Sequence, residues 1–157
     1  MSNREVLAEQ LNTYIAVCDV HQTRLESAAH HINTIFPLQA AELDKLNDQT
    51  ISFLDQMVYR FSKLQDTIGQ NICPLILKLL QEPLVSAPFI DQLNRLEQLG
   101  LMSTDHWLHM RELRNQVTHE YPEDNAKKVA LLNELFGQVA MLSDQWSVLK
   151  HFILERV

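Results

Sequence analysis

Apolar residues recur at steps of three and four along the first part of the chain, between residues 6 and 32. This spacing places them on one face of an α-helix, which has about 3.6 residues per turn. It predicts a helix over residues 4–35. Pro37 marks its end, because a proline disfavours helical geometry in the residue before it. The apolar stripe comprises Val6, Leu7, Leu11, Tyr14, Ile15, Cys18, Leu25, Ala29 and Ile32.

A second apolar stripe starts after Pro37 and is well established by Ile51. Pro74 falls inside its continuation, the run NICPLILKLL. Since proline has no N–H and clashes with the preceding turn, we expect a kinked or broken helix that stops by Pro83. The stripe comprises Phe53, Leu54, Met57, Val58, Phe61, Leu64 and Ile68.

Boundary signals divide the rest of the chain. Ser86, Ala87 and Pro88 are typical of an N-cap and first turn, and they predict a short helix over residues 89–99. Gly100 follows as its C-terminal residue, because glycine readily adopts the left-handed conformation found there.

Ser103 is the next expected N-cap, for a helix over residues 104–121 that stops at Pro122. Asp124 or Asn125 can cap a last helix. A link this short predicts that the last two helices are antiparallel neighbours. The apolar side of the last helix comprises Leu132, Leu135, Phe136, Val139, Leu142, Trp146 and Leu149.

Composition agrees with helices throughout. Only three of the 157 residues are glycine, whereas the tight turns of sheets usually need it. The chain length fits one domain. We therefore predict a single all-α domain over residues 1–157, an antiparallel bundle of five to six helices, with Trp107 and Trp146 in its core.

The net charge of −7 is unlike that of a generic nucleic-acid binder, so any RNA site must concentrate positive charge locally. Cys18 and Cys73 are far apart, which suggests buried free thiols in a reducing compartment. No apolar stretch approaches the roughly 20 residues that span a bilayer. With no apolar signal core at the N-terminus, we expect a cytoplasmic protein without membrane partners.

The most unusual chemistry lies in RNQVTHEY, residues 114–121. On an ideal helix Asn115 and His119 share one stripe, whereas Arg114 and His119 lie about 140° apart. Two interpretations are open. The segment is either a solvated polar face whose arginines pair with acids such as Glu112 and Glu120, or a site for phosphodiester chemistry.

The residue types suit metal-independent RNA cleavage without a cofactor. An arginine holds a phosphate with two parallel hydrogen bonds, and a histidine exchanges protons near neutral pH. The ribose 2′-OH then attacks the adjacent phosphate, so the substrate supplies the nucleophile. His106 and His109 lack an evident third ligand and the zincin spacing, so no metal site is expected there. Asp55 or Arg60 are candidates for a supporting role.

RELRNQVTHEYP resembles the R-x4-H-x-Y signature of HEPN-domain toxins of the HepT type, with Arg114, His119 and Tyr121 at the motif positions. The polar Asn115 after the arginine also matches. Two further stretches, YRFSKLQDTIG at 59–69 and RLEQLGLMSTDHW at 95–107, are similar to that family. The resemblance covers most of residues 50–150.

The resemblance implies a small helical ribonuclease, the toxin of a toxin–antitoxin pair, that forms a homodimer with two motifs facing each other. Arg114 would then bind the scissile phosphate, His119 act as general acid or base, and Asn115 orient. Arg111 and His109 are possible further RNA contacts. The implied partner is a nucleotidyltransferase antitoxin that transfers AMP to Tyr121. The alternative is a non-catalytic helical subunit of such a nucleotidyltransferase.

Overall fold

The computed structural model describes residues 1–157, except the side chains of Leu84 and Val85. It confirms the all-α prediction: along this chain every regular element is helical. The six α-helices are α1 (Asn3–His31), α2 (Asp48–Thr67), α3 (Cys73–Leu79), α4 (Phe89–Gln98), α5 (Thr104–Val117) and α6 (Asn125–Leu154). Shorter elements are the 3₁₀ turns η1 (Asn33–Ile35), η2 (Ala40–Lys45) and η4 (Pro83–Ser86), and the π-helical turn η3 (Ile68–Ile72).

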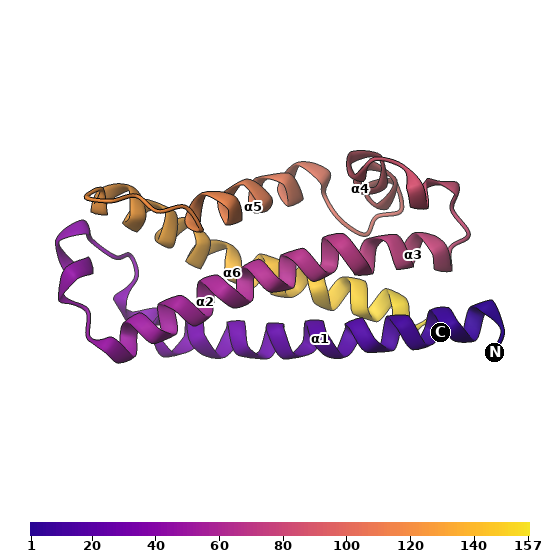
Figure 1. The fold of residues 1–157 in the computed structure, drawn as a ribbon, viewed down its shortest axis with the longest axis horizontal. Helices are drawn as coiled ribbons and strands as arrows, with labels where there is room; N and C mark the ends of the chain where they lie inside the picture. The colour runs from indigo at the N-terminus through magenta and orange to yellow at the C-terminus, as the bar shows by residue number, and fades with distance from the viewer.

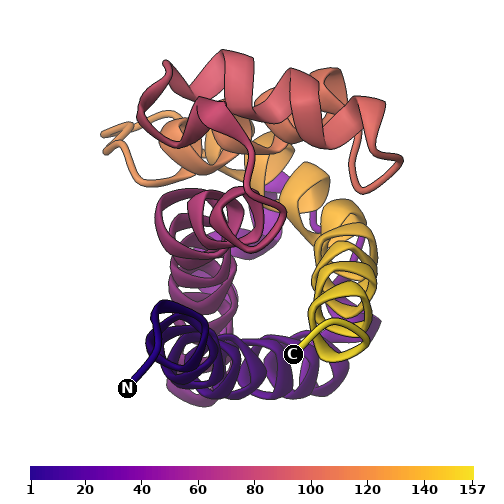
Figure 2. The ribbon, with the colours of Figure 1, turned by 90° about the vertical axis from the view of Figure 1, so that its right-hand side faces the viewer.

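The helices form an elongated antiparallel bundle (Figure 1). α1 runs along most of the length of the molecule, and α2 and α3 return beside it. The end-on view shows α1 below, α2 and α3 on one side, α6 on the other, and α4 with α5 above (Figure 2). α5 and α6 run in opposite directions and contact each other, as their short connection predicts. Both termini lie at the same end of the molecule.

One continuous apolar core fills the bundle. The predicted core positions of both tryptophans are confirmed, with Trp107 2% and Trp146 0% exposed. The indole N–H of Trp146 donates to Asp19 Oδ1 over 2.9 Å, which satisfies the one polar group of this side chain. None of the described helices is long and apolar enough to cross a membrane.

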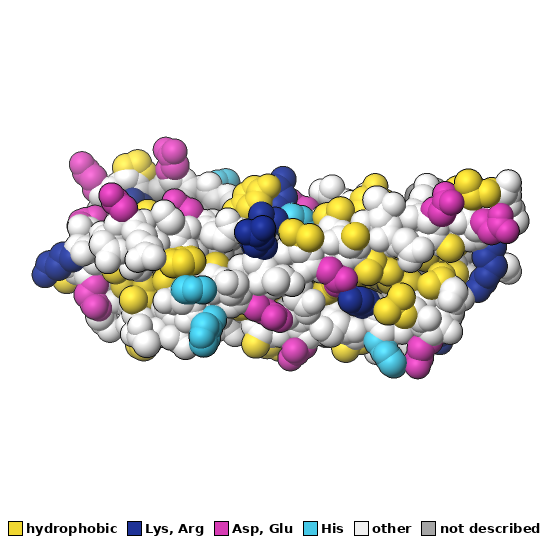
Figure 3. All heavy atoms as spheres, turned by 90° about the horizontal axis from the view of Figure 1, so that it is seen from below, with side chains coloured by type: hydrophobic (Ala, Val, Ile, Leu, Met, Phe, Trp, Pro, Cys, Tyr) yellow, Lys and Arg dark blue, Asp and Glu magenta, His cyan; other side chains and the backbone are white. Residues whose placement is uncertain are grey.

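The chain has a net charge of −7, but on the face shown in Figure 3 the acidic side chains are not segregated from the basic ones. Acidic and basic side chains are interspersed there, and apolar side chains gather in several groups between them. Single exposed apolar residues are normal on a protein surface. With a net charge of −7, any RNA site on this chain would need a local group of basic residues.

Several predicted boundaries are confirmed. Ser103 caps α5 by accepting from the N–H of His106, and Asp124 caps α6 by accepting from that of Lys127. Gly100, at φ +75°, ends α4 in the expected left-handed conformation. The N–H of Leu101 bonds to Leu96 O and that of Gly100 to Glu97 O, the hydrogen-bond pair of a Schellman motif.

The predicted end of the first helix and the predicted N-cap at Ser86 are wrong. The first helix ends at His31 rather than residue 35, because the chain tightens into η1 after it. Ser86 is not an N-cap, since it is the last residue of η4, and α4 begins after Pro88. Pro88 keeps the residue before it out of the helical region, so a helix starting at Ala87 is disfavoured.

Pro74 lies in the first turn of α3, immediately after the π-helical η3. The N–H of Cys73 bonds to Ile68 O, five residues back, which offsets the hydrogen-bond register just before the proline. A first-turn position tolerates proline, because the missing N–H has no required partner there. The predicted break at Pro74 therefore takes the form of a π turn between α2 and α3.

Both cysteines are free and fully buried, as expected. Burial raises the pKa of Cys18 and of Cys73 from 9.0 to about 12. Because the thiolate is the reactive form, we expect alkylation of the folded protein at pH 8 to be at least about 10³-fold slower than that of a free thiol. Iodoacetamide labelling followed by mass spectrometry measures this rate. Guanidinium should expose both thiols, whereas rapid labelling of either in the folded chain would contradict the burial.

Candidate functional site

α5 ends at Val117, four residues before the predicted end of that helix. Thr118 caps it, its hydroxyl donates to Asn115 O over 3.0 Å, and the N–H of His119 bonds back to Gln116 O. Residues 118–124 form the connection to α6, and Glu123 adopts φ +62° within it. His119 and Tyr121 therefore do not follow helical periodicity, and the expected 140° separation of Arg114 from His119 does not apply.

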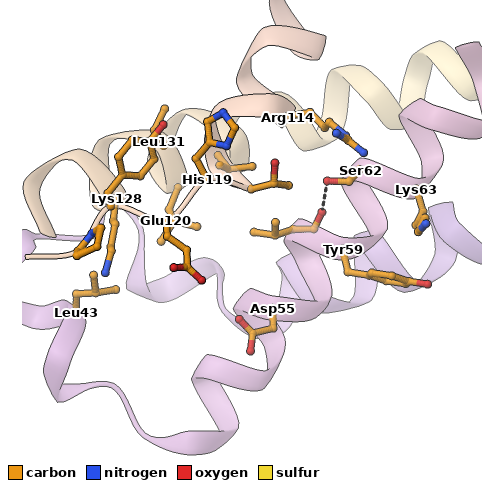
Figure 4. Close-up of a pocket in the computed structure, with 16 residues that line it drawn as sticks. Leu43, Asp55, Tyr59, Ser62, Lys63, Arg114, His119, Glu120, Lys128 and Leu131 are labelled. Atoms are coloured by element: carbon orange, nitrogen blue, oxygen red, sulfur yellow. Dashed lines mark hydrogen bonds between the residues drawn. The ribbon is translucent and has the colours of Figure 1, made fainter. Parts of the chain in front are cut away.

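A cleft of about 830 Å³ opens between α2, the end of α5 and the start of α6. Arg114, His119 and Tyr121 all line it, so a single chain brings the three motif residues to one opening. Figure 4 shows Arg114 and His119 among the side chains around this cleft. The volume falls in the range typical of ligand sites. The other lining side chains with charge are Asp55, Lys63, Glu120 and Lys128.

Arg114 is held by hydrogen bonds on both of its terminal nitrogens. Its Nη2 lies 2.8 Å from Asp66 Oδ2, and its Nη1 donates to Asn115 Oδ1 over 3.1 Å. Both members of the ion pair are about 29% exposed. Nε is buried and, among the described residues, makes no hydrogen bond. The guanidinium thus has a fixed orientation at the edge of the cleft.

Asn115 was expected to orient the site, and the group that it contacts is the guanidinium of Arg114. His119 is exposed, which suits a group that exchanges protons with a bound substrate. Its ring meets that of Tyr121 edge-on, with centroids 6.5 Å apart. The Nζ of Lys127 lies 4.5 Å from the centre of the Tyr121 ring.

Arg111 and His109 lie outside this cleft. His109 Nε2 is 2.8 Å from Glu134 Oε1 on α6. The Arg111 guanidinium lies over the ring of Phe89, 5.2 Å from its centre, and lines a second, smaller cleft. Arg111 and His109, which the sequence suggested as further RNA contacts, therefore do not line the cleft of His119.

Of the two residues suggested for a supporting role, Asp55 lines the cleft and Arg60 does not. Arg60 Nη1 instead lies 3.0 Å from His21 Nδ1 on α1. Burial, followed by the charges of Arg60 and Lys63, lowers the pKa of His21. Arg114 pairs with Asp66, a contact that the sequence did not predict. The two residues lie 48 positions apart along the chain.

Among the residues that the structure describes, no three His, Cys, Asp or Glu side chains gather in a way that could hold a metal ion. Comparisons with protein-family models, curated proteins and solved structures gave no match. The assignment of the cleft therefore depends on the chemistry of its own residues.

Asp66→Asn removes the charge that orients Arg114 while keeping a similar shape. If Arg114 binds the reacting phosphate, we expect RNA cleavage to fall about tenfold, since small misplacements of a catalytic group are costly. Loss of a partly exposed ion pair should lower the free energy of unfolding by less than about 1 kcal/mol. Cleavage rates and denaturant unfolding measure the two effects separately.

The matched control for this variant is Glu82→Gln. Glu82 pairs with Arg95 over 2.7 Å, outside both clefts, so it tests the loss of a similar ion pair elsewhere. This control should leave cleavage unchanged. Equal cleavage by the Asp66→Asn and Glu82→Gln variants would show that Asp66 does not position Arg114 for the reaction.

Proposed function

We propose that this chain is a metal-independent endoribonuclease, the toxin of a toxin–antitoxin pair. The observation that carries the proposal is that Arg114 and His119 line one cleft, although they come from a helix end and from the loop that follows it. The sequence resemblance to HepT-type HEPN toxins supports the same activity.

The proposed reaction is a transesterification within the RNA. The 2′-oxygen attacks the adjacent phosphorus, the bond from phosphorus to the 5′-oxygen breaks, and a 2′,3′-cyclic phosphate and a 5′-hydroxyl end result. Arg114 stabilises the negative charge that develops on the phosphate oxygens. His119 either takes the proton from the 2′-hydroxyl, while water protonates the leaving 5′-oxygen, or protonates that oxygen, while water takes the proton of the 2′-hydroxyl.

Local charge supports binding of a polyanion despite the net charge of −7. Lys63 and Lys128 line the cleft together with Arg114, on three different helices. Asp55 and Glu120 offset part of this charge. We therefore propose a homodimer in which two clefts lie close together, because pairing doubles the cations that an RNA strand meets.

The proposed partner is a nucleotidyltransferase antitoxin that transfers AMP from ATP to Tyr121. The phenol oxygen attacks the α-phosphorus and pyrophosphate leaves. Tyr121 lines the same cleft as Arg114, so an attached AMP would occupy space that RNA needs and would repel its phosphates. In this proposal Tyr121 controls the site and takes no part in cleavage.

Expression in bacteria tests the toxin proposal. The native chain should slow growth, and Arg114→Ala and His119→Ala should each restore it at equal protein levels. If the chain were instead a non-catalytic subunit of a nucleotidyltransferase, any effect on growth would not depend on Arg114 and His119. Unchanged toxicity in both variants would therefore refute the catalytic assignment.

A further inference from the structure

A second cleft, of about 340 Å³, lies beside the first. Asp66 lines it and also accepts the hydrogen bond from Arg114 Nη2, so the Asp66–Arg114 pair separates the two clefts. The volume lies near the lower end of the range for small-ligand sites. A group bound there would be next to the phosphate held by Arg114, if the proposed function holds.

Gln65, whose side chain ends in an amide, is one of the residues that line the second cleft. Gln65 is 3% exposed, and neither its Nε2 nor its Oε1 has a hydrogen-bond partner among the described residues. An unpaired buried amide is unfavourable, since both of its polar atoms lose water without replacement. A ligand that offers an acceptor beside a donor would satisfy both atoms. The edges of nucleobases carry that pair of groups, and glutamine recognises adenine through it.

The remaining lining suits the flat faces of a base. Phe89 is partly exposed and lies beneath the guanidinium of Arg111, which is exposed. Unstacked RNA bases bind in proteins by stacking on aromatic rings or on arginine planes, while their edges form hydrogen bonds. Arg111 also adds a cation to a cleft that would receive a nucleotide.

The backbone at this cleft departs from regular helix. Gly69 and Gln70 line it and belong to the π-helical η3, a rare turn that often occurs at functional sites. A Cβ on Gly69 would lie 3.3 Å from Phe89 Cζ, closer than such atoms usually pack. Glycine here lets the Phe89 ring reach the wall of the cleft.

We propose that the second cleft binds one unstacked RNA base next to the cleaved phosphate. This inference rests on the proposed ribonuclease function and adds a source of sequence preference to it. Gln65 reads the edge of the base, and Phe89 with Arg111 contacts its face. The first cleft, by contrast, holds the phosphate and carries out the chemistry.

The test compares two probes that cannot be cleaved. One is a short single-stranded RNA with 2′-O-methyl groups, and the other is the same sugar–phosphate chain without bases. The native chain should bind the first about tenfold more tightly, which is the scale of one stacked and hydrogen-bonded base. Fluorescence anisotropy measures both affinities.

Gln65→Met keeps the side-chain volume and removes the amide, so it should lose most of that tenfold difference. Gln56→Met is the matched control. Gln56 lies on α2, its Nε2 is also buried and has no hydrogen-bond partner among the described residues, and the residue lines neither cleft. It should bind like the native chain. Arg111→Gln, at an exposed position where the fold is not at risk, should also weaken binding of the RNA more than of the baseless probe.

Equal binding of both probes by the native chain would overturn the inference, as would native-like binding by Gln65→Met. A parallel cleavage assay on unmodified RNA separates the two proposals. If the chain cleaves RNA but Gln65→Met does not change its binding, the base site is refuted and the ribonuclease proposal stands. Base-dependent binding without any cleavage would refute the ribonuclease and leave a base-binding site.

Discussion

His119→Ala is expected to lower the rate of RNA cleavage by about 10²–10⁴-fold, the usual contribution of a positioned general acid or base. Arg114→Ala should lower it by about 10²–10³-fold, since it removes a preorganised donor aimed at the developing charge. Both side chains are at the surface of the cleft rather than in the core, so folding should survive. Single-turnover cleavage of a labelled RNA, with the enzyme in excess and at saturating concentration, measures these losses.

Arg95→Ala is the matched control for loss of an arginine in an ion pair, because Arg95 pairs with Glu82 away from both clefts. It should retain native cleavage. Equal rates for the native chain and both site variants would contradict the assignment.

A mixture of the Arg114→Ala and His119→Ala chains tests which chain supplies each residue. Because both residues line one cleft of one chain, we expect no recovery of activity on mixing. Recovery would instead indicate that Arg114 of one protomer acts with His119 of the other. Size-exclusion chromatography with light scattering shows whether mixed dimers form.

Transfer of one AMP to Tyr121 is expected to abolish cleavage and relieve growth inhibition. The phenol belongs to a half-buried side chain that lines the cleft, so the added phosphate and nucleoside would fill the place where RNA binds. Its negative charge would also compete for Arg114. Incubation with the partner nucleotidyltransferase and ATP, followed by intact-mass and peptide mass spectrometry, measures the modification.

Tyr121→Phe should gain no mass under the same conditions and should stay toxic when the partner is coexpressed. Tyr59 is the internal control, because it is a second tyrosine on the same cleft, half exposed, with Arg60 and Lys63 near its ring. AMP on Tyr59, or inhibition that persists in the Tyr121→Phe variant, would contradict this control mechanism.

The bundle was predictable because its core positions repeat with helical spacing. Leu11, Ile15 and Cys18 on α1, and Leu54, Met57 and Phe61 on α2, are all buried as that spacing indicates. Caps with local hydrogen bonds, such as Ser103 and Asp124, were also predictable. The misplaced N-cap at Ser86 shows the limit of such signals, because a following Pro88 and a preceding 3₁₀ turn decide where the helix starts.

The motif residues were visible in the sequence, but their geometry was not. Pro122 marked an end for α5, whereas the chain leaves the helix at Val117 in order to turn back into α6. That early exit changes the direction of His119 and brings it to the cleft of Arg114. Asp66 was not predictable as the partner of Arg114, because the contact joins α2 to α5 and follows from tertiary packing.

We propose that Arg114 and His119 promote cleavage of RNA by attack of its own 2′-hydroxyl. The most direct measurement is an analysis of cleavage products formed by the purified chain in the presence of EDTA. We expect a 2′,3′-cyclic phosphate on one fragment and a 5′-hydroxyl on the other, and no cleavage where a single 2′-deoxyribose replaces the attacking nucleotide. Cleavage that needs an added metal ion, or that continues at the 2′-deoxy position, would refute attack by the 2′-hydroxyl at this site.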